Sequence, residues 1–470
     1  MSQGKELAKN TGILFIGKIS TQFVSFLLLP LYTAKLSTEQ YGTLDLYTTI
    51  ASILMPILSL QLEQAIFRYF ITAEDDEKNI LSSTAIFLFF SSLILTLVYI
   101  PIAIIMSVEY AALVLMYYIT LLFSTVIQQV PRGYGNYKIY TLSAFLSSTI
   151  AILFSVLFIC VFNMNIDGIL IARIISAVFV VFYILIRCKL FNKIRIRCFK
   201  FSSLKSMLKY SVPLVFNQLG SWIVNYSDRV IIVSILDLGT NGIYAIANKF
   251  FTLITTTLNI YNMAWTESVT KALKDKDRNT YYNNVFSLTN ILFFLAASLV
   301  TCGIGIFFKW FIDPNYDDAY YQIPILVYAA MFSGLAANIG SVYIAHKMTK
   351  EISKTTLLTA VVNIIVHVAL ISFIGLYAAS ISTLVSFVVL FFYRIYKIRD
   401  IEMIHLNIKS LIPVLLLSVL VITTYYLRSI WIQLISLAIV IIYSCYYAFT
   451  SSLFKSQFKT IADKFMKKNK

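Results

Sequence analysis

The chain has 470 residues, of which 59% are hydrophobic and only 13% are charged, a composition that excludes a soluble globular protein. The net charge of +16 does not indicate a nucleic-acid partner. Most Lys and Arg lie between apolar stretches, on the side that the positive-inside rule marks as cytoplasmic. The composition therefore predicts a polytopic integral membrane protein with no nucleic-acid partner.

Apolar runs long enough to cross a bilayer recur along the whole chain, and each needs about 20 residues as a helix. Helices are expected because backbone groups that face lipid must be satisfied within their own segment. The pattern predicts an all-α protein with about fourteen transmembrane helices. The predicted spans are 10–36, 42–67, 81–106, 110–130, 139–162, 166–188, 210–237, 242–267, 284–309, 321–345, 355–374, 376–393, 410–427 and 431–452.

The first span is too long for a cleavable signal peptide and lacks a small-residue cleavage site, so we expect it to be retained. An even number of spans places both termini on one side, and the Lys and Arg distribution makes that side cytoplasmic. All predicted outer loops are short, including the longest one at 310–320. The sequence thus predicts a multi-pass membrane protein without a folded outer domain.

The apolar stretch Lys9–Gly42 aligns without a gap on Lys209–Gly242. Within this alignment Lys18 falls on Gln218 and Ser25 falls on Asn225, and both copies end in a short polar turn that contains Gly. Six spans separate the two copies, so the halves are predicted to be parallel repeats related by an axis along the membrane normal. Membrane proteins built in this way usually carry their ligand between the halves, which favours transport.

The repeat predicts four parts of the chain. These are an N-terminal six-helix bundle at 1–186, a basic cytoplasmic linker at 187–209, a C-terminal six-helix bundle at 210–394, and two further helices with a basic tail at 395–470.

Four cations fall inside predicted spans, namely Lys18, Arg173, Arg229 and Lys249. A charge at membrane depth costs about 2.5–3.5 kcal/mol on insertion scales, so it usually faces a bundle interior or a water-filled cavity. The alternative is a structural ion pair or a side chain that extends to the headgroups. No single acid is expected to balance them, because the adjacent Asp228 points about 100° away from Arg229 on the same helix.

Uncharged and acidic polar residues recur at helical spacing in three spans and form polar faces. Two interpretations remain open: hydrogen bonds that hold helices together, or a shared aqueous cavity. Excess cations in such a cavity favour an anionic ligand such as phosphate, and the amides and hydroxyls suit sugars. The faces comprise Asp45, Thr48, Ser52, Ser59 and Glu63 in 42–67, Asn217, Ser221, Asn225 and Asp228 in 210–237, and Asn248, Thr252, Thr256 and Asn259 in 242–267.

The sequence predicts no metal and no cofactor, because its three His and five Cys are scattered without ligand spacing. It also has no nucleotide-binding domain, so energy for transport is expected from an ion gradient or from the gradient of the substrate itself. Asp228 and Glu63 are the candidates for a coupling ion, because a carboxyl in a site of low dielectric constant can titrate near neutrality.

The opening KNTGILFIGKISTQFVSFLLLPLYTAKLSTEQYGTLDLYTTI resembles the Wzx-type flippases of polysaccharide repeat units, which act in O-antigen and capsule synthesis. The second-half opening KYSVPLVFNQLGSWIVNYSDRVIIVSILDLGTNGIYAIANKF resembles the same family. That family belongs to the multidrug/oligosaccharidyl-lipid/polysaccharide (MOP) exporter superfamily, which also contains MATE multidrug exporters and lipid II flippases. The resemblance spans essentially the whole chain in helix count and repeat arrangement.

The resemblance implies a V-shaped pair of six-helix bundles around a cationic cavity, with two further helices. It implies that the protein moves an undecaprenyl-pyrophosphate-linked oligosaccharide from the cytoplasmic to the outer leaflet by alternating access. By position, Lys18, Arg229 and Lys249 are candidates for binding the pyrophosphate or acidic sugars. Arg173, Asn217, Asn225 and Asn248 complete the predicted substrate-binding set.

Two alternatives to a flippase remain. A cation-coupled small-molecule or multidrug exporter of the same fold would be expected to centre on an acidic, aromatic site, whereas the first span carries Lys18 and no acid. A membrane-embedded glycan polymerase or ligase would need an acid, base or nucleophile set that the short outer loops do not offer. The expected partners are the lipid-linked oligosaccharide and membrane lipids, with a polysaccharide polymerase or glycosyltransferases as candidate protein partners.

Overall fold

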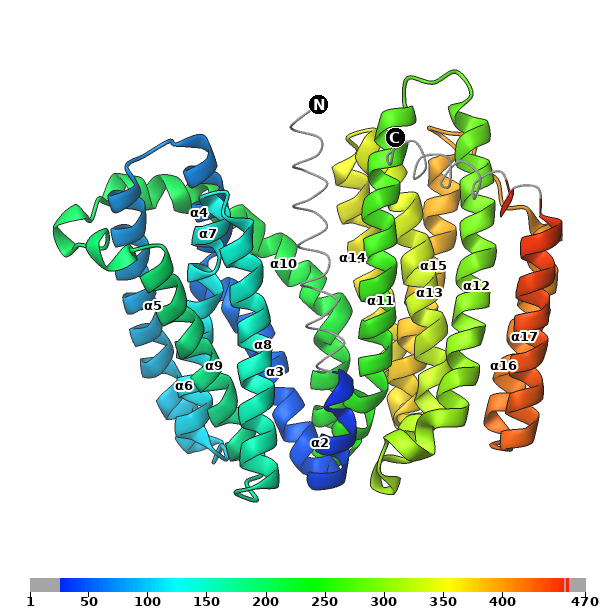
Figure 1. The fold of residues 1–470 in the computed structure, drawn as a ribbon, viewed down its shortest axis with the longest axis horizontal. Helices are drawn as coiled ribbons and strands as arrows, with labels where there is room; N and C mark the ends of the chain where they lie inside the picture. Colours follow the sequence, from blue (N-terminus) through cyan, green and yellow to red (C-terminus); the bar gives the residue numbers. More distant parts are fainter. Residues whose placement is uncertain (1–25, 452–453, 456–470) are drawn as a thin grey trace, which may run out of the picture. The chain divides into compact units, whose positions relative to one another are not determined.

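The structure, a computed structural model, describes residues 26–451 and 454–455 (Figure 1). Every regular element in this part of the chain is a helix, and eleven helices are long and apolar enough to cross a membrane. The predicted all-α, polytopic fold is confirmed. Of the other three predicted spans, 10–36 lies mostly outside the described residues, and two coincide with 35-residue helices that are richer in polar residues.

The chain divides into two compact units, Met1–Gly242 and Ile243–Lys470. The four-part division proposed from the sequence stays a prediction. The helices of the first unit are α2 (Leu29–Lys35), α3 (Thr38–Ser59), α4 (Leu62–Thr72), α5 (Glu77–Ile105), α6 (Ala111–Ile127), α7 (Gln129–Gly133), α8 (Tyr137–Cys160), α9 (Ile166–Arg187), η1 (Leu190–Asn192), η2 (Ile196–Cys198) and α10 (Phe201–Ile235).

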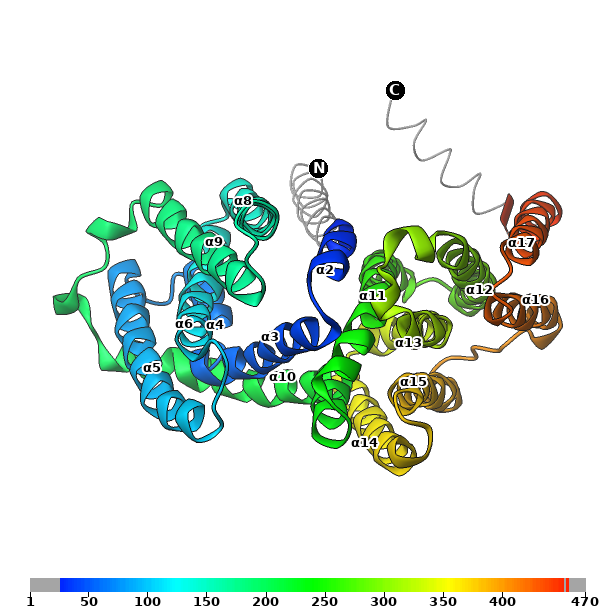
Figure 2. The same cartoon turned by 90° about the horizontal axis from the view of Figure 1, so that it is seen from below.

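Within the first unit, α9 packs against both α6 and α8, and α10 packs against α3, α4 and α5 (Figure 2). The second predicted span, 42–67, is not one continuous helix. It breaks between α3 and α4, where Leu60 and Gln61 both adopt left-handed backbone conformations with φ of 46° and 58°. This conformation is uncommon for residues other than Gly, so it marks a local constraint on the chain.

The two repeat copies begin their second helices in the same way. Ser37 caps α3 by accepting a hydrogen bond from the backbone N–H of Gln40 at 3.1 Å. At an offset of 200 residues, Asp237 accepts from the backbone N–H of Thr240 at 2.7 Å, at the start of α11 (Leu238–Ala272). Hydrogen bonds from the backbone and side chain of Thr240 lower the pKa of Asp237. Each cap fixes where the second helix of its copy starts.

The starts of α3 and α11 cross at two glycines, Gly42 and Gly242. A Cβ on Gly42 would lie 1.8 Å from the carbonyl oxygen of Leu238, and a Cβ on Gly242 would lie 1.9 Å from that of Thr38. Asn241 adds a hydrogen bond from its side-chain amide to the carbonyl of Gly42 at 3.0 Å. The contact is reciprocal, because each glycine meets the carbonyl four residues before the other. Only glycine permits backbones to approach so closely.

The second unit continues α11 and adds α12 (Arg278–Phe311), η3 (Pro314–Tyr316), α13 (Asp318–Ala345), α14 (Thr349–Ile374), α15 (Tyr377–Ile398), α16 (Ile408–Tyr426) and α17 (Ile430–Thr450). The helix α13 packs against α12, α14 and α15, and 78% of its most apolar stretch is buried. The last two helices, which have no counterpart in the repeat, pack against α12.

The loop between α16 and α17 is attached to the start of α13. Arg428 donates two hydrogen bonds to the carboxylate of Asp317, at 2.6 and 2.5 Å, and this lowers the pKa of Asp317. The rings of Tyr320 and Tyr425 stack with centroids 4.1 Å apart, and each hydroxyl donates to the backbone carbonyl of the other residue. These contacts hold one end of the α16–α17 hairpin to the bundle.

The opposite end is held by Glu402, which lies in the segment between α15 and α16. Its buried carboxylate lies 2.8 Å from Nε of Arg278 and 3.0 Å from Nε2 of His346. Asn283 of α12 also bonds the backbone of this segment at residues 403 and 405. The hairpin is therefore fixed to the second unit at both ends.

Candidate functional site: a charged polar face in the first unit

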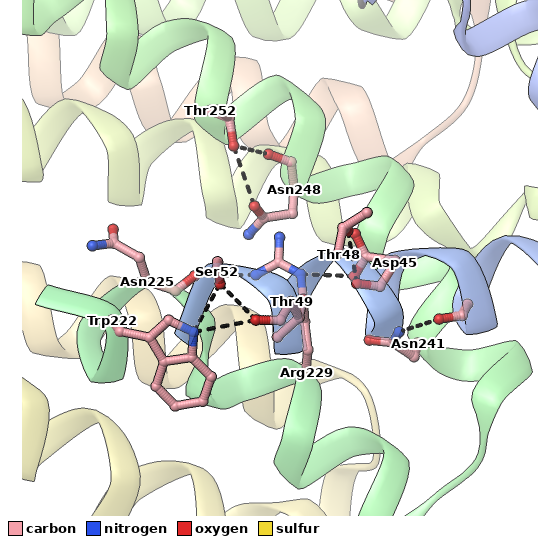
Figure 3. Close-up of polar contacts among 11 residues, drawn as sticks. Asp45, Thr48, Thr49, Ser52, Trp222, Asn225, Arg229, Asn241, Asn248 and Thr252 are labelled. Atoms are coloured by element: carbon pink, nitrogen blue, oxygen red, sulfur yellow. Dashed lines mark hydrogen bonds and ion pairs between the residues drawn. The ribbon is translucent and has the colours of Figure 1, made fainter. Parts of the chain in front are cut away.

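The polar faces of α3 and α10 meet at a buried ion pair (Figure 3). Nε of Arg229 on α10 lies 2.8 Å from Oδ2 of Asp45 on α3, and the two side chains are only 8% and 10% exposed. The guanidinium also donates from Nη1 to the carbonyl of Asn225 at 3.0 Å and lies 5.2 Å from the ring centroid of Tyr226. Asp45 was predicted to lie on a polar helix face and Arg229 was predicted to be an intramembrane cation, but their pairing was not predicted.

For Arg229, this pair corrects the expectation that no single acid balances the intramembrane cations. That expectation considered only Asp228, the neighbour of Arg229 in sequence. Asp45 lies 184 residues away, and helical spacing within one segment does not reveal which face of another helix it meets. A paired charge is far less costly to bury than an isolated one, so Arg229 is compensated where it lies.

A second contact between the same helices lies about two turns from the ion pair. The indole N–H of Trp222 on α10 donates to the hydroxyl of Ser52 at 2.8 Å and lies 3.4 Å from the carbonyl of Thr49 (Figure 3). Trp222 and Tyr226 stack with centroids 6.3 Å apart. The indole and the guanidinium therefore fix the register of α3 against α10.

The predicted stripe on α10 divides into an exposed part and a buried part. Asn217 and Asn225 are exposed. The hydroxyl of Ser221 donates to the backbone carbonyl of Asn217 at 3.2 Å, and the side-chain amide of Asn225 donates to the backbone carbonyl of Ser221 at 2.7 Å. Asp228 is buried, with 4% of its surface exposed. The amides therefore occupy a different environment from the charged residues that follow them.

In the second unit, α11 carries the predicted residues Asn248 and Lys249. Asn248 is 6% exposed, and Thr252 donates to its backbone carbonyl at 3.0 Å. Lys249 is half-buried. These residues form their own polar face on α11.

The other predicted cations lie elsewhere. Arg173 on α9 is half-buried, and its guanidinium lies 5.7 Å from the ring centroid of Tyr117 on α6. Lys18 lies outside the described residues. Arg173 therefore belongs to an aromatic environment between α6 and α9.

Glu63 follows the break between α3 and α4. The side-chain amide of Gln61 donates to its Oε1 at 2.9 Å, and only 7% of the residue is exposed. Its Oε2 is buried and has no hydrogen-bond partner among the described residues. Glu63 takes part in no salt bridge in the described part of the chain, so hydrogen bonds alone stabilise its charge in this buried position.

One buried cation was missed by the sequence analysis. Arg394 on α15 is 5% exposed and lies between α13, α14 and α15. Its Nε and Nη2 both donate to Oγ1 of Thr355 at 3.1 Å, and its Nη1 donates to the carbonyl of Ala336 at 2.8 Å. The predicted span ended at residue 393, which placed Arg394 at a helix end, whereas α15 continues to Ile398.

No group of three or more His, Cys, Asp or Glu side chains in the described part of the chain could hold a metal ion. What the site offers instead is a set of charges and amides on helices long enough to cross a bilayer. Such groups bind and release polar solutes. Fold and site together define a polytopic all-α membrane protein that carries charged and amide groups within its helix bundle.

The chain belongs to the family described as Polysaccharide biosynthesis protein, which it matches over residues 7–267. It is 23% identical over 365 residues to an uncharacterised membrane protein of Haemophilus influenzae, a match that covers 76% of this chain and 88% of that protein. A protein of the Lsg locus of the same species is 44% identical over 62 residues, a match that spans 13% of this chain and 16% of that relative's length.

Two solved structures share the fold. The lipid II flippase MurJ in an inward closed conformation superposes with a TM-score of 0.69 at 15% identity, covering 94% of this chain and 99% of that chain. An inward-facing MATE multidrug resistance transporter of the MOP superfamily superposes with a TM-score of 0.61 at 16% identity, and the match covers 81% of this chain and 95% of that chain. The family match confirms the predicted relationship to polysaccharide biosynthesis proteins, and the two solved structures confirm the predicted fold.

Proposed function

We propose that this protein is a flippase that moves an undecaprenyl-pyrophosphate-linked oligosaccharide repeat unit from the cytoplasmic to the outer leaflet of a bacterial inner membrane. The observation that carries the proposal is the buried Asp45–Arg229 pair on a transporter fold of the polysaccharide biosynthesis family. A guanidinium presents several donors in a fixed plane, which suits phosphate oxygens. The exposed amides of Asn217 and Asn225 suit sugar hydroxyls.

In this proposal Asp45 holds Arg229 in place until an anionic substrate competes for the guanidinium. The exchange keeps the guanidinium of Arg229 paired throughout, and the Asp45 carboxylate that it releases must then take up a proton or another hydrogen-bond donor. Arg173 and Lys249, together with Lys18, are proposed to complete the cationic path, and Asn248 is proposed to contact the sugars. The termini are proposed to be cytoplasmic, and a polymerase or glycosyltransferases are proposed partners.

The test is to delete the gene and extract lipid-linked saccharides from cells that carry the wild-type gene or a variant. Loss of surface glycan with a complete lipid-linked unit on the cytoplasmic leaflet would support the flippase. Unchanged lipid-linked sugars with altered drug or ion tolerance would favour the exporter alternative. Formation of glycosidic bonds by the purified protein would favour a polymerase or ligase.

A double variant separates binding by Arg229 from mere packing. Asp45→Asn together with Arg229→Gln removes both charges while keeping polar groups of similar size. If the pair only stabilises the helices, the double variant should restore surface glycan wherever it is stably expressed. If Arg229 binds the anion, the double variant should be present in the membrane but inactive. Lys276→Ala, an exposed cation between α11 and α12, is the matched control and should remain active.

Coupling to a cation is proposed to use Glu63 rather than Asp228. The buried Oε2 of Glu63 has no hydrogen-bond partner among the described residues, and the nearby helix break supplies a point at which the segment can rearrange. Transport by Glu63→Gln should lose its dependence on the proton gradient, and transport by Asp228→Asn should keep it. Glu267→Gln, an exposed acid on α11, is the control. Retained gradient dependence in Glu63→Gln would exclude this role.

A further inference from the structure

The segment between α9 and α10 concentrates positive charge. Between residues 187 and 209 the sequence contains Lys and Arg but no Asp or Glu. The segment includes the short helices η1 and η2 and directly joins two long helices of the first unit. Because the segment lies beside helix ends, we expect it at a membrane surface. Its positive charge predicts that this surface is the cytoplasmic one.

The segment is held against the start of α5. Lys193 forms an ion pair with Glu77 at 2.6 Å, and Ser82 accepts a hydrogen bond from the backbone N–H of Arg195 at 3.0 Å. The hydroxyl of Ser83 accepts a hydrogen bond from the backbone N–H of Lys200 and donates one to its carbonyl. Figure 1 shows the result, in which α10 begins beside the N-terminal end of α5. The backbone of this segment therefore has a defined position on the helix bundle.

This attachment leaves large apolar side chains exposed among exposed cations. Ile196 is 84% exposed, and contact of so much apolar surface with water is unfavourable. We call the exposed groups the linker patch. Its apolar members are Phe191, Ile196, Phe199 and Phe201, and its cations are Lys189, Arg195, Arg197 and Lys200.

We propose that the linker patch lies in the headgroup layer of the membrane and binds anionic phospholipid. The aromatic and aliphatic side chains enter the boundary between headgroups and acyl chains, and the cations contact lipid phosphates. Charge complementarity selects this occupant, because the patch has four exposed cations and the segment has no acid of its own. The continuity of the segment with α9 and α10 holds it at the depth that headgroups occupy.

The consequence for the protein is a local excess of anionic lipid at the junction between α9 and α10. Each cation near an anionic surface is expected to strengthen binding by roughly fivefold, with salt weakening the effect. Removal of four such cations should therefore lower the preference for anionic over zwitterionic lipid by at least roughly tenfold, after screening. This inference is independent of the transported substrate.

The experiment uses the full chain in nanodiscs that contain phosphatidylglycerol and phosphatidylcholine. A variant that keeps only Cys198, within η2, carries an environment-sensitive fluorophore. Quenching by phosphatidylglycerol with brominated chains is compared with quenching by equally brominated phosphatidylcholine. The charge variant is Lys189→Gln, Arg195→Gln, Arg197→Gln and Lys200→Gln. The matched control removes four other exposed cations, Lys274, Lys276, Lys347 and Lys350.

The proposal expects stronger quenching by phosphatidylglycerol in the parent and in the control, and loss of this preference in the charge variant. Added salt should reduce the preference in the parent without any substitution, which provides a measurement that does not depend on variant folding. Equal quenching by the two lipids, an unchanged preference in the charge variant, or no quenching by either lipid would overturn the proposal. Phosphatidylglycerol retained by unlabelled protein, counted after lipid extraction, should follow the same order.

Discussion

Replacing Gly42 with Ala should destabilise the protein, because α3 and α11 touch there through their backbones. The added Cβ would lie 1.8 Å from the carbonyl oxygen of Leu238 and 2.9 Å from the backbone nitrogen of Gly242. Backbone atoms cannot rotate away as a side chain can. The two helix starts must therefore separate by more than about 1 Å to reach an ordinary contact.

The size of the effect follows from two opposing contributions. Overpacking of a well-packed contact costs about 1–3 kcal/mol and sometimes more. The change from Gly to Ala inside a helix returns about 1 kcal/mol through helix propensity. Because the contact at Gly42 is with rigid backbone, we expect the upper part of the range and a net loss of about 2 kcal/mol. Gly220 on α10 is the matched control, because a Cβ there would meet nothing within 4 Å.

The assay is the apparent unfolding temperature of the detergent-solubilised protein, followed by tryptophan fluorescence and by size-exclusion chromatography after heating. Gly42→Ala should unfold at a lower temperature than the parent, and Gly220→Ala should unfold at the same or a higher temperature. The double variant with Gly242→Ala should lose less than the sum of the two single losses, because the first substitution already separates the helices. An unfolding temperature for Gly42→Ala equal to that of Gly220→Ala would refute the reasoning.

Three further predictions concern buried or paired charges. Asp45→Asn or Arg229→Gln alone should each cost about 3–5 kcal/mol, and the double variant should cost less than either, as measured in a double-mutant cycle; additive losses would contradict the pairing. Arg428→Gln should lower the unfolding temperature at neutral pH, and the difference from the parent should shrink as pH falls below about 4. The reason is that Arg428 lowers the pKa of Asp317 in the folded state, so its contribution disappears when that carboxyl is protonated. A difference that is independent of pH would rule out this pair as the cause. Arg394→Gln should cost about 2–3 kcal/mol through lost hydrogen bonds of a charged donor, and an unchanged unfolding temperature would show that these bonds are dispensable.

The sequence was sufficient to predict which parts of the chain are helical and how the two copies align. That alignment succeeds because each copy carries its own local N-cap and its own glycine at the equivalent position. Ser37 and Asp237 cap equivalent turns, and Gly42 and Gly242 cross at an offset of 200 residues. The polar faces were also visible in the sequence, because helical periodicity places residues on faces.

The partners of those faces were not predictable by the same reasoning. Periodicity places Asp45 on a polar face, and Arg229 is recognisable as a cation inside a predicted span, but neither observation says that the two side chains meet. The helix break at Leu60 and Gln61 was missed for a different reason. Neither residue is Gly or Pro, the two residue types that usually indicate a break in a helix. Arg394 was missed because a boundary error of a few residues moved a buried cation to a helix end.

The ion pair is present in only one copy of the repeat, unlike the glycine crossing, which is present in both. At an offset of 200 residues the counterpart of Asp45 is Ala245 and the counterpart of Arg229 is Leu29, both of them buried and apolar. The glycine crossing follows the repeat because two helices cannot approach closely without it. The charges do not follow the repeat, since the other copy has buried apolar residues at the equivalent positions. A buried ion pair is often no more stable than well-packed apolar residues, so stability alone does not require the pair. A charged pair that occurs in only one copy of the repeat is consistent with the proposed ligand-binding role of Arg229, and the Asp45→Asn, Arg229→Gln double variant tests that role directly.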